Sequence, residues 1–340
     1  MRTRYRSSWS RKLVTAIVTA TAFTLMPLGV NAQSIRVKGS SFPEILYERY
    51  QSEYQQDTGV NLRYRALGSG RGIRLFISQL TDMGSSTLIP TPIEQAQMRD
   101  GLVMVPTAGG AIAIVYNLQN VSGKVKLSRE QLVGIFTGDI GNWSQIHPRL
   151  PNRQINVVTR SDNSGTTFLL TKYLNKLSGG LIKASRQPDW GFELYAQRPQ
   201  DSGVAAEVRR IDGAIGYVQS AFATQNDLPV AELENRSGRY VKPTVEETKK
   251  ALANVQFNED FTLDRFEEPE DGYPLVGLTW LLMYQKYESE TALQSAQNFV
   301  NWVLTKGQEF NEEEEYSRIP EETAVKVREF INNQLKVRPY

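Results

Sequence analysis

Three short loops combine glycine with hydroxyl side chains in a pattern that suits anion binding. They are GSSFP at residues 39–43, GSGRG at residues 68–72 and RSDNSGTT at residues 160–167. Each follows a strand-like run and precedes a helical pattern, so each is expected to place N–H and O–H donors at a helix N-terminus. One such loop is usually a plain turn. Three of them, one with an arginine, predict a site for a small, multiply charged anion.

The candidate ligand groups are the short polar residues of these loops and one guanidinium. They are Ser40, Ser41 and the N–H of Phe42 in the first loop, Ser69 and Gly70 in the second, and Arg160, Ser164, Gly165 and Thr166 in the third. A guanidinium offers a planar pair of donors to two oxyanion oxygens, and Asp162 is placed to orient it. None of the loops has the spacing of a P-loop or of a G-x-G-x-x-G motif.

Alternating strand and helix patterns are expected to position these loops. Strand patterns occur at residues 35–37, 60–64, 103–105, 111–116, 155–159, 214–218 and 278–284. Between Ile73 and Leu80 the apolar residues follow helical spacing, Ser128 with Gln131 predicts a capping box, and the last helical patterns lie at residues 296–304 and 327–335. This alternation predicts an α/β fold, in which ligands bind beyond the carboxyl ends of strands.

Residues 1–32 have the pattern of a secretory signal peptide. Five basic residues precede a mostly apolar run, which ends at Val30, Asn31 and Ala32 in a manner that suits cleavage before Gln33. An uncleaved membrane anchor is the alternative, although the apolar run is short for a span and contains several threonines. Because no cysteine follows the run, a lipoprotein is excluded and a periplasmic location is expected.

The signal peptide accounts for the basic balance of the whole chain. There are 39 basic and 37 acidic residues in total, and residues 1–32 hold five basic residues and no acidic one. The other 308 residues therefore carry 34 basic and 37 acidic residues, a formal charge of −3. This balance gives no reason to expect nucleic acid as a partner. A chain of this length predicts two domains.

The residue types also limit the catalytic options. The chain has no cysteine and a single histidine, His147, which lies in a polar loop before a proline. A cysteine nucleophile and a thiolate metal site are impossible, and a serine–histidine hydrolase would depend on His147. The sequence has no cluster of carboxylates with histidine that would predict a metal site. We therefore expect a protein that is not an enzyme and has no metal or cofactor, with an exported phosphatase as the alternative.

A series of motifs resembles the periplasmic phosphate-binding proteins of phosphate ABC transporters. In chain order they are GSSFP (39–43), TGV (58–60), GSGRG (68–72), DMGSS (82–86), FTG (136–138), NW (142–143), RSDNSGT (160–166), GAIGY (213–217) and YP (273–274). They occur in the order of that family and span nearly all of the chain after the signal peptide. The arginine-to-threonine motif is the most diagnostic of them.

The resemblance implies a two-lobed periplasmic-binding-protein fold of the α/β class, with the ligand cleft between the lobes. Lobe 1 would comprise residues 33–112 and 276–340, and lobe 2 residues 113–275. The implied ligand groups are Ser41, Phe42, Ser69, Arg160, Ser164, Gly165 and Thr166, with Asp162 pairing with the arginine. The implied ligand is inorganic phosphate, which a monomer would deliver to the membrane permease of an ABC transporter.

One position departs from the family pattern. In the family, the stretch DFGAS is usually followed by a second aspartate, which accepts the proton of bound phosphate and so rejects sulfate. The corresponding stretch here is DMGSS, and it is followed by Thr87. A hydroxyl accepts a hydrogen bond but does not repel a dianion. Thr87 is therefore a candidate ligand residue. It leaves open a receptor for another tetrahedral oxyanion such as sulfate, and a phosphate sensor or scavenger is a further alternative. A shift in the register of the motif match would also explain why Thr87, and not an aspartate, falls at this position.

Overall fold

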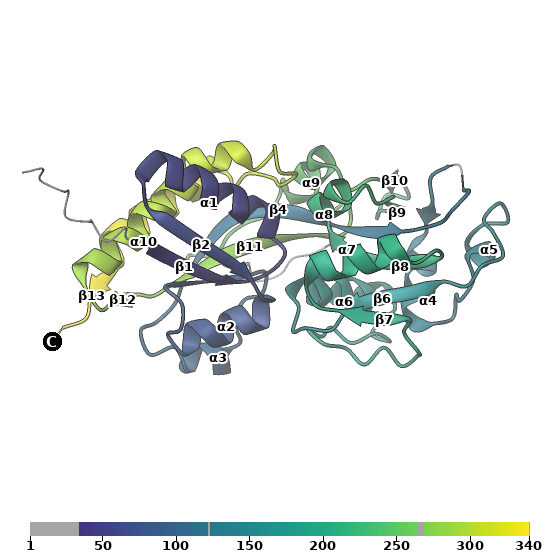
Figure 1. Cartoon of the computed structure of the whole chain (residues 1–340), viewed down its shortest axis with the longest axis horizontal. Helices are drawn as coiled ribbons and strands as arrows, with labels where there is room; N and C mark the ends of the chain where they lie inside the picture. Colours follow the sequence, from purple (N-terminus) through teal and green to yellow (C-terminus); the bar gives the residue numbers. More distant parts are fainter. Residues whose placement is uncertain (1–33, 122, 264–267, 340) are drawn as a thin grey trace, which may run out of the picture. The chain divides into compact units, whose positions relative to one another are not determined.

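One long strand, β4 (Val103–Tyr116), joins the two halves of an eight-stranded sheet. The computed structural model describes residues 34–121, 123–263 and 268–339, so the expected signal peptide at residues 1–32 lies outside the described residues. The strand order is β2-β1-β3-β11-β4-β8-β6-β7 (Figure 1). β4 pairs with β11 (Val276–Met283) along residues 103–111 and with β8 (Ala214–Gln219) along residues 112–116, both antiparallel. We call the strands from β2 to β11 the first half-sheet, and those from β8 to β7 the second.

In the first half-sheet, each parallel strand is followed directly by a helix. β1 (Ser34–Gly39) lies between β2 (Asn61–Ala66) and β3 (Met83–Ser86) and is parallel to both. The helices that follow these strands are α1 (Glu44–Thr58), α2 (Ser69–Ile77) and α3 (Pro92–Ala96). After β11 come α10 (Glu290–Val303), η1 (Lys306–Phe310) and α11 (Glu321–Gln334), and the short strands β12 (Lys286–Tyr287) and β13 (Lys336–Val337) pair with each other. The carboxyl ends of β1 and β2 therefore open into helix N-termini at the same sheet edge.

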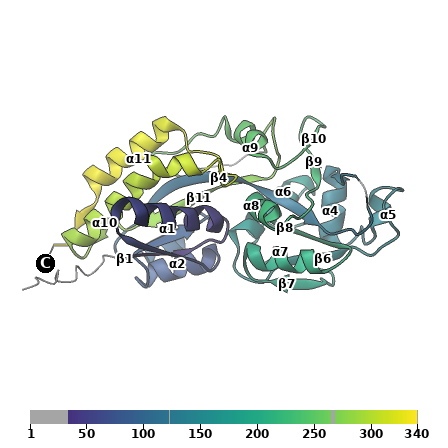
Figure 2. The same cartoon turned by 45° about the horizontal axis from the view of Figure 1, so that its top comes forward.

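The second half-sheet repeats this arrangement. β6 (Asn156–Arg160) lies between β8 and β7 (Ala196–Arg198) and is parallel to both. α6 (Gly165–Leu177), α7 (Gln200–Arg210) and α8 (Ser220–Gln225) follow β6, β7 and β8 (Figure 2). The other elements are β5 (Lys126–Leu127), α4 (Arg129–Thr137), α5 (Trp143–Ile146), β9 (Glu232–Glu234), β10 (Tyr240–Val241) and α9 (Val245–Leu252), with β5, β9 and β10 in a small separate sheet.

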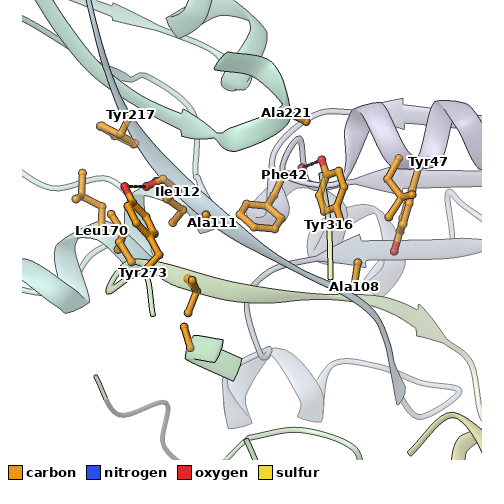
Figure 3. Packing of buried hydrophobic residues seen from close by; sticks show 14 of the residues in the cluster. Phe42, Tyr47, Ala108, Ala111, Ile112, Leu170, Tyr217, Ala221, Tyr273 and Tyr316 are labelled. Carbon is orange, nitrogen blue, oxygen red and sulfur yellow. Dashed lines mark hydrogen bonds between the residues drawn. The ribbon is translucent and has the colours of Figure 1, made fainter. Parts of the chain in front are cut away.

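Aromatic residues pack tightly against the middle of β4. The rings of Phe42 and Tyr316 meet edge to face with centroids 6.2 Å apart, and the Tyr316 hydroxyl donates to the Phe42 carbonyl at 2.6 Å (Figure 3). Tyr273, just before β11, donates from its hydroxyl to the carbonyl of Ile112 at 3.0 Å. A Cβ on Gly110 would lie 2.9 Å from the Phe42 ring. A glycine is therefore needed at this point of β4, and the first glycine loop is anchored on that strand.

The α/β class and the predicted elements are confirmed, with two corrections. Residues 103–105 and 111–116 belong to one continuous strand, because β4 runs through its central glycines to pair with β11 and then with β8. Leu80 was expected on the buried face of a helix, but α2 ends at Ile77, Gln79 has a φ of 56°, and Leu80 is 57 % exposed. The capping box of Ser128 and Gln131 is present at the start of α4. In the described part of the chain, no helix combines the length and apolarity needed to cross a bilayer.

Candidate functional site

The three glycine loops come together although they belong to different half-sheets. Residues 39–43 and 68–72 follow β1 and β2, whereas residues 160–167 follow β6. The N–H of Gly70 donates to the carbonyl of Asn163 at 3.0 Å, and the Ser41 hydroxyl donates to Asp201 in the second half at 2.6 Å. The predicted polar side chains are all at most 3 % exposed: Ser40, Ser41, Ser69, Thr87, Arg160, Ser164 and Thr166. The structure thus gathers the predicted groups into one buried polar cluster.

The first loop presents one hydroxyl to the other half of the molecule. Ser40 is held by its own loop and by β3, because its N–H donates to the carbonyl of Ser85 at 2.9 Å and its Oγ accepts from the N–H of Phe42 at 3.1 Å. The two predicted groups of Ser40 and Phe42 therefore satisfy each other in this structure. Ser41 is the residue of this loop whose side chain reaches the second half-sheet.

Thr87 lies against the second and third loops. Its Oγ1 is 3.0 Å from the Oγ of Ser69, and its N–H donates to the same Oγ at 3.1 Å. A Cβ built on Gly165 would come within 1.7 Å of Thr87 Oγ1 and 2.6 Å of Ser69 Oγ. The end of β3 and the first turns of α2 and α6 therefore meet at this point, where only glycine fits at position 165.

Two carboxylates fix the orientation of Arg160. Its Nε and Nη2 donate to the two oxygens of Asp162 at 2.7 and 2.6 Å, and its Nη1 donates to Asp201 at 2.5 Å. Arg160 is only 2 % exposed. Burial by itself disfavours the charge, but the charges of Asp201 and Asp162 outweigh this effect and hold the pKa of Arg160 above its ordinary value. The guanidinium is therefore a permanent, oriented cation.

The N-terminus of α6 provides two backbone donors that have no protein partner. The Oγ of Ser164 accepts from the N–H of Thr167 at 3.1 Å and so caps the helix. Across the described ranges of the chain, the N–H groups of Gly165 and Thr166 have no acceptor, although both residues are buried. A buried N–H without an acceptor is costly. An oxyanion placed here would supply the missing acceptor.

Sequence reasoning missed Asp201. This residue lies in the first turn of α7 and is fully buried. Its oxygens accept from the backbone N–H of Gln219 at 2.9 Å as well as from Ser41 and Arg160, and the Thr166 hydroxyl is 3.4 Å away. The helix α7 was not predicted, and nothing in the local sequence distinguishes this aspartate from a surface turn residue.

An ion pair also joins the two half-sheets beside this cluster. Both terminal nitrogens of Arg186 donate to Glu94 in α3, at 2.7 and 3.0 Å. The carbonyl of Arg186 accepts from the N–H of Ser164, which links the pair to the third loop. The pair holds the pKa of Glu94 below its ordinary value even though burial opposes this shift. Contacts between the two half-sheets are therefore not confined to the buried cluster.

The histidine lies outside the cluster. His147 is exposed, and its Nδ1 accepts from the N–H of Arg149 at 3.1 Å. Of the residues that the structure describes, no three acidic or histidine side chains are placed to share a metal ion. The cluster combines hydrogen-bond donors, one guanidinium and the two carboxylates that contact it.

Comparisons with known proteins point to one family and one fold. The family model described as "PBP superfamily domain" matches residues 27–306. The chain is 32 % identical to the phosphate-binding protein PstS of Haemophilus influenzae, over 90 % of this chain and 94 % of the relative. It is 30 % identical to the phosphate-binding protein PstS of Pasteurella multocida, over 94 % of this chain and 96 % of the relative.

Among solved structures, the chain is similar to the periplasmic phosphate-binding protein PfluDING bound with phosphate. The TM-score is 0.78 at 21 % identity, and the match covers 90 % of this chain and all of the other. A putative phosphate ABC transporter substrate-binding protein from Clostridium perfringens gives a TM-score of 0.65 at 18 % identity, over 85 % of this chain and all of the other. These likenesses confirm the predicted two-lobed periplasmic-binding-protein fold.

Proposed function

We propose that this chain, which belongs to the PBP superfamily and within it to the phosphate-binding proteins PstS, captures inorganic phosphate and delivers it to an ABC transporter. The chain matches these relatives, which are named for phosphate binding, over nearly their whole length. The observation in this chain that carries the proposal is the pair of buried, unpartnered N–H groups of Gly165 and Thr166 beside the fixed cation of Arg160.

The proposed ligand groups can replace the water around a tetrahedral anion. Arg160 would offer Nη hydrogens that its carboxylates leave free, and Gly165 and Thr166 would offer their N–H groups. The hydroxyls of Ser41, Ser69 and Thr87 would complete the set, with Ser40, Phe42, Gly70 and Ser164 shaping the loops that carry them. Fixed donors in a buried site are worth more than the same donors in water, and a desolvated oxyanion needs nearly all of its oxygens satisfied.

Capture would involve closure of two lobes. We place lobe 1 at residues 33–112 and 276–340 and lobe 2 at residues 113–275, so that the chain crosses between lobes within β4 and again just before β11. Contacts from Ser41 to Asp201 and from Arg186 to Glu94 would hold the closed form, because each joins one proposed lobe to the other. Hinge closure around a ligand is a known motion of such architectures.

The proposal extends to location and mode of action. We place the protein in the periplasm as a monomer, exported by cleavage of residues 1–32 and not attached to lipid. Its partners would be phosphate and a membrane permease. It would act by binding without turnover, which the exposed position of His147, away from the buried cluster, supports.

A titration of residues 33–340 tests the proposal. Calorimetry with phosphate is expected to show one site per chain, and phosphate at about 100 times its Kd should add about 2.7 kcal/mol to the free energy of unfolding and raise Tm. Sulfate at the same ionic strength serves as the competing ligand. The absence of both heat and a Tm shift at millimolar phosphate would show that the buried cluster does not bind it.

A further inference from the structure

The carboxylate of Asp201 is buried among the groups that we propose as donors to the anion. It is fully buried and receives the Ser41 hydroxyl at 2.6 Å and Arg160 Nη1 at 2.5 Å, with the Thr166 hydroxyl 3.4 Å away. The backbone N–H of Gln219 donates to its other oxygen at 2.9 Å. All three side chains that contact Asp201 are ones that we place around the ligand. A bound anion would therefore lie next to this carboxylate.

The charges of the cluster restrict which anion can bind. Arg160 contributes one positive charge, and Asp162 and Asp201, both in contact with it, contribute two negative ones. A fully deprotonated dianion beside Asp201 would meet a carboxylate with no hydrogen between them. An anion that carries its own hydrogen would instead donate it to Asp201 and turn the repulsion into a hydrogen bond.

We infer that Asp201 is the residue that accepts the hydrogen of bound phosphate and thereby selects protonated oxyanions over fully deprotonated ones. This inference rests on the proposed function. The exchange is balanced and moves no proton between molecules: the P–O–H group donates to Asp201, and the Ser41 hydroxyl, which donates to Asp201 in this structure, turns to a ligand oxygen. Hydrogen phosphate and hydrogen arsenate would bind, whereas sulfate and selenate would be rejected.

The other polar groups at the site are less suited to this role. Thr87 is uncharged, and its Oγ1 is engaged with Ser69 at 3.0 Å. Both oxygens of Asp162 accept from Arg160, and one also accepts from the N–H of Gln200. Glu44 adds negative charge nearby but makes no hydrogen bond to any ligand group in the described structure. Asp201 alone among these carboxylates contacts ligand hydroxyls from both half-sheets.

The test compares four anions in parent and variant chains of residues 33–340. Kd is measured by calorimetry at fixed pH and ionic strength for phosphate, arsenate, sulfate and selenate. In Asp201→Asn the ratio of sulfate Kd to phosphate Kd should fall by about tenfold or more, and selenate should follow sulfate. The phosphate-to-arsenate ratio should stay within about threefold, because both anions carry a hydrogen.

Two control variants separate proton acceptance from charge alone. Asp162→Asn and Glu44→Gln each remove one nearby negative charge without touching the carboxylate that faces Ser41 and Thr166. In both, the sulfate-to-phosphate ratio should stay within about threefold of the parent, even where affinity changes. Equal shifts in all three variants would show that net charge sets the ratio and would overturn the inference.

Other outcomes are equally decisive. If Asp201→Asn weakens all four anions in parallel, Asp201 only positions Arg160 and the inference fails. If Asp201→Asn does not fold, Ser41→Ala keeps the carboxylate and removes its competing donor, so rejection of sulfate must persist there; loss of that rejection would overturn the inference. A parent that binds none of the anions would overturn the proposed function itself. A parent that binds phosphate, with an unchanged ratio in Asp201→Asn, would overturn only the role of Asp201.

Discussion

Glu44 gives a prediction whose size follows from the structure. It is the first residue of α1, and its Oε2 is buried without a hydrogen-bond partner. Burial raises the pKa of Glu44 to about 7 from an ordinary value of 4.5, and the charges of Glu48 and Asp201 add to this effect, while Arg160 opposes it. The carboxyl group is therefore stable in its neutral form near the anion site.

The change Glu44→Gln should stabilise the protein at high pH and not at low pH. The two pKa values correspond to about 3 kcal/mol, and partial exposure of the side chain reduces the expected effect to about 2 kcal/mol. Below about pH 4.5 both folded and unfolded chains hold the proton, and no difference is expected. Between about pH 4.5 and 7 only the folded chain holds it, so the free energy of unfolding of the parent falls as pH rises. Gln has no proton to lose.

Urea unfolding of parent and Glu44→Gln at a series of pH values measures this effect. Glu290→Gln is the matched control, because Glu290 is exposed and also begins a helix, α10. The control removes the same charge from the same helix position, where the helix dipole contributes about 0.3–1 kcal/mol. Parallel pH profiles for parent and Glu44→Gln would refute the reasoning, since they would mean that Glu44 ionises alike in the folded and unfolded chains.

Three further predictions concern ligand binding. Arg160→Lys should weaken phosphate binding in calorimetry by about tenfold or more, because the planar pair of donors is lost. Asp162→Asn should weaken it less, by freeing the guanidinium. Equal affinities in both variants and the parent would mean that Arg160 is not part of the site. Thr87→Asp should raise the ratio of sulfate Kd to phosphate Kd at fixed pH and salt, through repulsion of a dianion without a proton; an unchanged ratio would mean that Thr87 does not face the ligand. Glu94→Gln should speed phosphate release in stopped flow by about fivefold, since a partly exposed bidentate pair with Arg186 contributes about 1 kcal/mol to the closed form. An unchanged rate would mean that the pair does not hold the lobes closed.

Local patterns in the sequence predicted the elements that carry the site because their causes are local. The capping box of Ser128 and Gln131 lies within four residues, and the structure shows both of its hydrogen bonds. The loops after β1, β2 and β6 combine glycine with short polar residues, which suit a chain leaving a strand for a helix. The rule that carboxyl ends of parallel strands share an edge accounts for Ser41 and Ser69, which follow β1 and β2. Arg160 ends β6 in the other half-sheet, so the tertiary fold brings it to them.

The features that sequence reasoning missed depend on distant partners. Gly110 lies between the two strands predicted at residues 103–105 and 111–116. It belongs instead to one continuous strand, where its lack of a side chain makes room for the ring of Phe42. Leu80 fits the helical spacing, yet the backbone turns at Gln79 before the helix reaches it. In both cases the apolar spacing identified the element, and contacts with distant residues or a turn of the backbone set where the element ends.

Asp201 shows why the chemistry of a site is harder to predict than its location. Its hydrogen-bonding partner Ser41 is 160 residues away in the sequence, and its own segment has the composition of a turn. Together with Asp162, it holds the pKa of Arg160 above its ordinary value, so the guanidinium beside it stays charged. A site of this kind recognises an oxyanion by the hydrogen that the anion brings as much as by its charge. The loops therefore predict that an oxyanion binds, whereas the buried carboxylate decides which one.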